Sequence, residues 1–291
     1  RAACADLALA QSAQLPSTTV DYLHRLVARA HNQLYRSKRF DYRAWFDKIF
    51  VDTPKLIFND PSVHIAAVLF WGLFLIAAWL AGDDSAWPEF AEQVVGEQML
   101  DQMTDMYTNT GEGDRDFGTN GFMFGFYVFN NASIGINCFV TMLMVLPGII
   151  TLCYNAVFLG TIFGYLFRPD MGDASLNFKR FVTAHGPFEL TAVVLSAGAG
   201  LKIGLSWMMP RGRRRLDAMI QTAREALPIA MCAVILFCLA AIIEGFISPV
   251  SEKYLPWWTK GTVAVVCSTI LMFYFVVLGY PRDAAGESDA V

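Results

Sequence analysis

The chain has 291 residues, of which 55% are hydrophobic and only 16% are charged, and its formal net charge is −4. An average soluble domain carries about 25% charged residues. The low charge and the high apolar content exclude a disordered protein, a collagen-like fibre and a nucleic-acid binder with an extended basic face. Because the apolar residues gather in blocks long enough to form spanning helices, the sequence predicts an all-α polytopic membrane protein.

Residues 1–61 are predicted to form a cytoplasmic amphipathic helical segment. Residues 18–39 place apolar side chains on one helical stripe and arginines elsewhere. A second stretch combines aromatic and basic side chains, among them Arg43, Trp45 and Lys48. An aromatic and basic helix suits the anionic inner surface of a membrane or contact with a partner. The alternative, that this stretch packs beneath the membrane helices, is equally compatible with the pattern.

The apolar blocks predict about six membrane-spanning helices, since one span needs about 20 mostly apolar residues. The predicted spans are 62–81, 122–146, 148–167, 181–209, 227–247 and 261–280. The break between the second and third spans is placed at Pro147-Gly148, a turn dipeptide. The uninterrupted apolar run from 122 to 167 is about twice as long as one span. The main alternative is five spans with one re-entrant segment.

The segments outside the spans differ sharply in charge. Residues 1–61 hold nine Lys/Arg, whereas the loop 82–120 holds ten Asp/Glu and one basic residue. Basic segments stay in the cytoplasm. The pattern therefore predicts the cytoplasmic membrane of a prokaryote, with both termini inside, a cytoplasmic tail at 281–291 and an outer acidic loop with an amphipathic helix over 87–107. A second basic cluster, a candidate contact for lipid or a partner, consists of Arg211, Arg213, Arg214 and Arg215.

Several polar side chains fall at membrane depth, where each needs a partner or a function. The predicted outer-half polar cluster consists of His185, Glu189, Glu244, Asn130, Asn131 and Asn155. Three explanations are open: a structural hydrogen-bond network, a transport or proton-relay site, and a metal-dependent hydrolase that uses one histidine and two glutamates. The His-Glu-x-x-His helix of zinc proteases and the known nucleophile motifs are missing from the sequence. We therefore expect no catalytic residues, no metal and no cofactor.

An ordered series of motifs resembles the stage II sporulation protein M family, SpoIIM, formerly DUF95. The motifs are His185-Gly-Pro-Phe-Glu189-Leu190, the small-residue stretch 197–204, Ile242-Ile-Glu244-Gly-Phe-Ile-Ser-Pro249, the pair Asn130-Asn131, the segment 155–160 and the lead-in 22–31. The resemblance implies an integral membrane protein with these motif residues at its centre. Founding members act with peptidoglycan-remodelling partners during sporulation, and relatives are often encoded near an AAA-type ATPase. The long acidic outer loop departs from the family pattern, so we carry over the architecture and not the sporulation role.

Together these features predict a non-enzymatic membrane protein that scaffolds or assembles a complex as an oligomer. The expected partners are membrane lipid, further copies of the chain, and a cytoplasmic AAA-type ATPase or other membrane proteins; no nucleic acid is expected. A transporter or channel that uses the polar cluster is the first alternative. A metal-dependent intramembrane hydrolase is the second.

Overall fold

The computed structural model describes residues 2–34, 42–83, 85–108, 117–250 and 254–281. The chain divides into two compact units, Arg1–Asp47 and Lys48–Val291. The first unit contains α1 (Ala2–Ser12), α2 (Ser17–Leu34) and α3 (Tyr42–Asp47). Here α2 is strongly amphipathic, and it carries the stripe predicted over 18–39 as far as Leu34; the remainder of that prediction lies outside the described residues.

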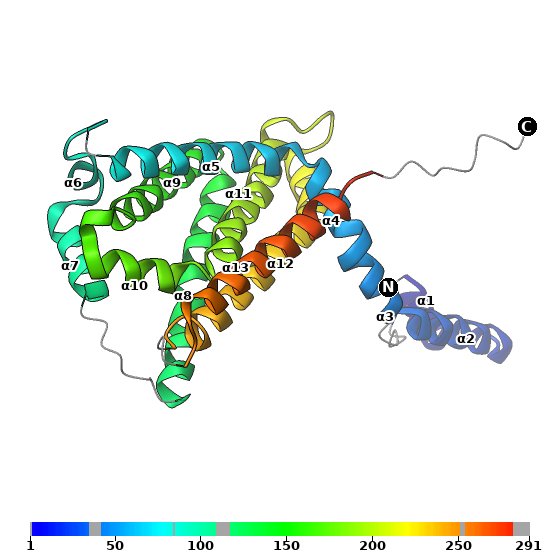
Figure 1. Cartoon of the computed structure of the whole chain (residues 1–291). Helices are drawn as coiled ribbons and strands as arrows, with labels where there is room; N and C mark the ends of the chain where they lie inside the picture. Colours follow the sequence, from blue (N-terminus) through cyan, green and yellow to red (C-terminus); the bar gives the residue numbers. More distant parts are fainter. Residues whose placement is uncertain (1, 35–41, 84, 109–116, 251–253, 282–291) are drawn as a thin grey trace, which may run out of the picture. The chain divides into compact units, whose positions relative to one another are not determined.

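The second unit is entirely helical in its described part (Figure 1). It begins with a π-helical turn η1 (Lys48–Asp52), followed by α4 (Thr53–Asn59), α5 (Pro61–Gly82), α6 (Phe90–Val95), α7 (Glu97–Thr108) and α8 (Phe117–Met142). It continues with α9 (Leu146–Leu166), a 3₁₀ turn η2 (Pro169–Met171), α10 (Gly172–Val182), α11 (Gly186–Met208), α12 (Arg215–Phe246), α13 (Trp257–Met272) and a second π-helical turn η3 (Phe273–Val277).

Five of the described helices are long and apolar enough to cross a membrane: α5, α9, α11, α12 and the continuous run of α13 and η3. The all-α polytopic class is thereby confirmed. Helix α8 has 26 residues and is also long enough. Four asparagines, Asn120, Asn130, Asn131 and Asn137, interrupt its apolar residues, and it is not among the five helices above. The sixth span therefore stays a prediction.

Helix α11 forms the centre of this unit, because 78% of its most apolar stretch is buried, against 11% for the run of α13 and η3. It packs against α5, α8 and α12. Small residues allow the close approach, as predicted from the 197–204 stretch. A Cβ added at Gly200 would lie 2.4 Å from the Phe139 carbonyl oxygen, and one added at Gly204 would lie 2.5 Å from that of Met142.

Helices α5 and α9 lie side by side (Figure 1). The pair Gly160 and Gly164 makes this contact, since a Cβ at either position would come within 2.3 Å of a backbone oxygen of α5. The spacing is the Gly-x-x-x-Gly pattern of tightly packed membrane helices. Close packing thus involves two glycine pairs, Gly160 with Gly164 on α9 and Gly200 with Gly204 on α11. Only the pair on α11 was predicted from the sequence to allow close contact.

The turn between the second and third predicted spans lies earlier than Pro147-Gly148. Helix α8 ends at Met142 and α9 begins at Leu146, with Val145 in an unusual positive-φ conformation before it. Pro147 lies in the first turn of α9. The N–H groups of the first helical turn have no acceptor within the helix, so a proline there loses no hydrogen bond. Pro147 therefore starts α9 and does not separate α8 from α9.

Other predicted boundaries also need correction. The helices of the second and sixth predicted spans begin earlier, at Phe117 and Trp257. The fourth span begins at Gly186, because residues 181 and 182 are the last two of α10. The fifth predicted span is part of a longer helix that starts at Arg215, so Pro228 lies inside α12 and not near its start. Good helix formers over 215–226 extend this helix toward the amino end. The outer amphipathic helix is divided into α6 and α7 by Gly96, whose φ of 91° favours glycine.

Candidate functional site

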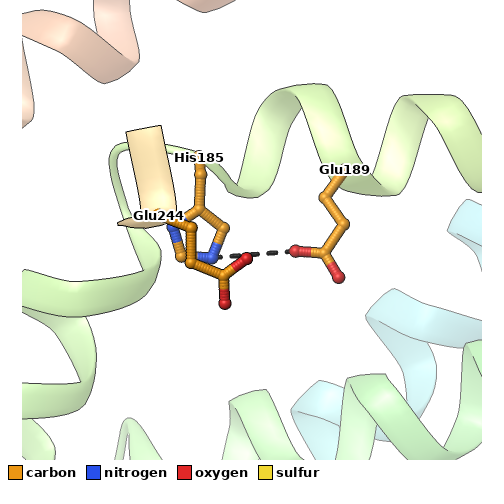
Figure 2. A group of neighbouring side chains, drawn as sticks. All are labelled: His185, Glu189 and Glu244. Carbon is orange, nitrogen blue, oxygen red and sulfur yellow. Dashed lines mark ion pairs between the residues drawn. The ribbon is translucent and has the colours of Figure 1, made fainter. Parts of the chain in front are cut away.

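The centre of the predicted polar cluster lies at the amino end of α11 and the carboxyl end of α12. His185 is the residue that precedes α11, Glu189 lies in its first turn, and Glu244 lies in the last turn of α12. One ligand atom of each of these three residues lies within 4.8 Å of the others. Their side chains converge in Figure 2. We call these three residues the His-Glu-Glu cluster.

His185 is oriented by contacts on both sides of its ring. Its Nε2 lies 3.7 Å from Glu189 Oε2, the dashed line of Figure 2. Its Nδ1 lies 3.1 Å from Ser248 Oγ. The ring also makes an edge contact with Phe181 at 5.3 Å between centroids. His185 and Ser248 are both buried, so the two nitrogens of the imidazole have defined and different neighbours.

Glu244 is held by a chain of amides from α8. Asn131 Nδ2 donates to Glu244 Oε2 at 3.1 Å. Asn130 Nδ2 in turn donates to Asn131 Oδ1, also at 3.1 Å. Asn131 and Glu244 are buried. The polar cluster therefore joins three helices, α8, α11 and α12.

Asn155 does not share these hydrogen bonds. Its Nδ2 donates to the Thr151 carbonyl oxygen one turn earlier in α9, at 2.8 Å, and lies 4.0 Å from Cys138 Sγ. A polar side chain at membrane depth is commonly satisfied by a carbonyl of its own helix. The structure therefore connects His185, Glu189, Glu244, Asn130 and Asn131 through contacts and leaves Asn155 bonded within α9.

Sequence reasoning missed Ser248 and Tyr107. The Tyr107 ring of α7 packs on Phe178 at 5.0 Å and on Phe181 at 6.1 Å, and Phe181 contacts His185. Burial raises the pKa of the Tyr107 hydroxyl, and the nearby carboxylates of Glu244 and Glu189 raise it further. The hydroxyl therefore stays protonated and neutral beside the cluster. The sequence signal for Tyr107 was the amphipathic pattern over 87–107, but that pattern did not distinguish Tyr107 from its neighbours.

Electrostatics makes the pairing of Glu189 with Glu244 costly when both are ionised. One oxygen of each carboxylate lies within 4.8 Å of the other, and two unit charges at that limit repel by about 3 kcal/mol at an effective dielectric constant of about 20. Glu244 is 7% exposed and Glu189 side chain 20% exposed, so water screens them only partly. The site therefore favours a bound positive charge, whether a proton or a cation.

A separate ion pair lies in the same unit. Lys202 lies with its Nζ 2.6 Å from Asp60 Oδ2. Asp60 also accepts a hydrogen bond from the Ser62 N–H at the start of α5. This pair joins α11 to α5 at the end of α11 away from the His-Glu-Glu cluster.

The predicted lipid or partner contacts fall into both units. Arg43 and the exposed Trp45 belong to the amino-terminal unit, whereas Lys48 begins the second. In the second unit, Arg213 donates to Gln221 Oε1, and Arg215 lies over the Trp207 ring at 5.0 Å. The basic residues 211–215 are exposed, along the loop and first residue that lead into α12.

Comparison with known proteins decides the family. Residues 66–249 match the family described as Stage II sporulation protein M. This chain belongs to that family. The matched range contains the whole His-Glu-Glu cluster together with Ser248 and the asparagines of α8. Membership and the five apolar helices together establish a membrane protein of the SpoIIM type, a family not known for catalysis.

Two further matches are narrower. Residues 1–36 match a domain of unknown function, DUF8413, which falls within the amino-terminal unit. An uncharacterized protein of Methanocaldococcus jannaschii is 30% identical over 137 residues, which cover 44% of this chain and 75% of that protein. No solved structure matches.

Proposed function

We propose that this protein is a non-enzymatic membrane scaffold that assembles with further copies of itself through α13. The observation that carries the proposal is the small share of this helix that its own chain covers: 11% of the most apolar stretch within Trp257–Val277 is buried. Its lateral contacts are chiefly with α11 and, through η3, with α4.

A stripe of small residues runs along the edge of the exposed side of α13. Gly261, Ala264 and Ser268 recur at intervals of three and four residues, so they fall on one side of the helix; Ser268 is exposed, and Gly261 and Ala264 are partly buried. A Cβ at Gly261 would meet nothing within 4 Å. Without a hydrophobic force between helices in lipid, small residues promote association by letting backbones approach. A second copy supplies the same stripe, as a two-fold symmetric interface requires.

An apolar groove adjoins the same helix. A cavity of about 560 Å³ lies between α5, α9, α11 and α13, and its lining includes Trp71, Phe163, Leu190 and Leu271. Its position beside a helix that is little covered supports packing of a neighbouring helix against α13. On the cytoplasmic side, we assign the basic residues 211–215 to contact with anionic lipid or with a cytoplasmic AAA-type ATPase.

Crosslinking in the native membrane tests self-assembly. We expect a variant with Ser268→Cys in a background without the native cysteines to form disulfide-linked dimers on oxidation. The matched control keeps only Cys238, which is exposed on α12. Equal crosslinking of the two variants, or monomers alone from Ser268→Cys, would count against the proposal. Gly261→Leu added to Ser268→Cys is expected to abolish the dimer.

Transport is the second candidate, because ionisable residues at membrane depth mark ion pathways in many membrane proteins. Glu189 keeps 20% of its side chain exposed, which supports access from one side. Proton or cation flux in proteoliposomes tests this candidate. Flux that disappears in Glu189→Gln and persists in Glu225→Gln would support transport, whereas flux that is absent in the unmodified protein would exclude it.

A further inference from the structure

The His-Glu-Glu cluster has the donor set of a metal site. It offers one imidazole nitrogen and two carboxylate oxygens, all within 4.8 Å of one another. Divalent first-row metals such as Zn²⁺ accept histidine nitrogen and glutamate oxygen at about 2.0–2.2 Å. Three ligands around one such ion lie a few ångströms apart, so small side-chain rotations bring these three atoms into coordination.

The second observation is the shell of partners outside the cluster. Histidine ligands usually engage their other ring nitrogen in a hydrogen bond, and carboxylate ligands are in turn hydrogen-bonded. Here His185 Nδ1 contacts Ser248 Oγ at 3.1 Å, which directs Nε2 toward Glu189. Asn131 donates to Glu244 at 3.1 Å. Two of the three candidate ligands, His185 and Glu244, are thus held in place by hydrogen-bond partners outside the cluster.

Burial also suits a bound ion. His185 is 3% exposed and Glu244 is 7% exposed, whereas the Glu189 side chain is 20% exposed. Two ligands are therefore fixed in the protein interior, and the third is partly exposed. The positive charge of the ion would also relieve the repulsion between the two carboxylates.

We propose that His185, Glu189 and Glu244 bind one divalent transition-metal ion of the Zn²⁺ or Mn²⁺ type. The ion would join the amino end of α11 to the carboxyl end of α12. This site goes beyond the scaffold proposal, because a metal at these helix ends needs neither a second copy of the chain nor a partner. A negative result for metal binding would not bear on the proposed α13 interface.

Metal content of the full chain is the first test. The protein is purified in detergent without a histidine tag, stripped with a chelator, supplied separately with Zn²⁺, Mn²⁺ or Mg²⁺, and freed of excess ion. We expect about one Zn²⁺ or Mn²⁺ per chain by mass spectrometry of the metal. No retained metal, or retention of Mg²⁺ alone, would overturn the proposal.

Isosteric variants show whether the bound ion occupies this site. Glu189→Gln and Glu244→Gln keep the side-chain shape, and Gln at 244 can still accept from Asn131. The matched control is Glu225→Gln, an exposed residue on the same helix as Glu244. We expect metal to raise the melting temperature of the unmodified protein and of Glu225→Gln, and to leave both site variants unchanged. Equal metal content in all four proteins would overturn the assignment.

The Ser248 contact offers a graded test. Loss of an outer partner of a ligand typically weakens metal binding by about 10–100-fold. We expect Ser248→Ala to fold and to bind Zn²⁺ or Mn²⁺ with an affinity lowered by this factor, measured by competition with a fluorescent chelator. An unchanged affinity in Ser248→Ala would show that the Ser248 contact does not orient a metal ligand and would count against the site.

Discussion

The ammonium group of Lys202 on α11 lies 2.6 Å from the carboxylate of Asp60 at the start of α5. Asp60 is buried and Lys202 is partly exposed. The two residues stand 142 positions apart in the chain, and their ion pair adds to the packing of α11 against α5. Asp60 also accepts the Ser62 N–H, so the same carboxylate caps a helix and neutralises a charge.

Removal of the lysine charge is expected to destabilise this junction. Lys202→Met leaves the buried Asp60 carboxylate without its ion partner, at a cost of about 1–3 kcal/mol in the free energy of unfolding. Asp60→Asn keeps the cap but leaves the ammonium unpaired, with a similar cost. The double variant should lose less than the sum of the two, as measured by unfolding in a denaturing detergent. Strictly additive losses would show that the pair is not coupled.

Truncation of Glu244 should leave the Asn131 amide of α8 without its acceptor. Glu244→Ala in metal-stripped protein is expected to lower the free energy of unfolding by about 1–3 kcal/mol, because a buried donor loses its hydrogen bond. Glu244→Gln retains an acceptor oxygen and should lose less. Thermal unfolding in detergent compares the two, with Glu225→Ala on the exposed part of α12 as the control. A loss as large in Glu225→Ala would contradict this explanation.

A methyl group at Gly200 should force α11 away from α8. The added Cβ would lie 2.4 Å from the Phe139 carbonyl oxygen, and overpacking of this kind costs about 1–3 kcal/mol. The control is Gly72→Ala on α5, whose Cβ would meet nothing within 4 Å. We expect a lower melting temperature for Gly200→Ala and an unchanged or higher one for Gly72→Ala. The reverse order would contradict the observed packing.

The predicted orientation can be tested with single cysteines and a membrane-impermeant thiol reagent. Gln102 on α7 and Asp217 on α12 are both exposed, and the charge pattern assigns them to opposite sides. In intact cells, we expect Gln102→Cys to be labelled and Asp217→Cys to be protected until the membrane is permeabilised. Labelling of both cysteines in intact cells, or of Asp217→Cys alone, would reverse or reject the topology with both termini inside.

Prediction from the sequence succeeded where a property is local along the chain. The lengths of the apolar blocks located the helices, and the resemblance in the motifs around His185 and Glu244 identified the family that residues 66–249 match. Helix ends were less accurate. Pro147 was predicted at a break and Pro228 near the start of the fifth span, yet Pro147 begins α9 and Pro228 lies within α12, because the neighbouring residues and packing decide whether a proline ends a helix.

The composition of the candidate site could be predicted only in part. His185 and Glu189 lie four residues apart, so helical geometry alone places them on one face. Glu244 and Asn131 are 113 residues apart, and their meeting depends on how α8, α11 and α12 rotate and cross. For the same reason Asn155 looked equivalent to the other asparagines, although its amide bonds to Thr151 in its own helix.

The sequence by itself determined that this is a membrane protein of many helices, because apolar runs of spanning length must leave water whatever their tertiary contacts. The sequence also identified the few polar side chains that lie at membrane depth, where burial without a partner costs free energy. Only the tertiary structure decided which of these meet. The packing of α11 against α12 brings segments that are distant in the chain together, and that proximity makes His185, Glu189 and Glu244 a single site.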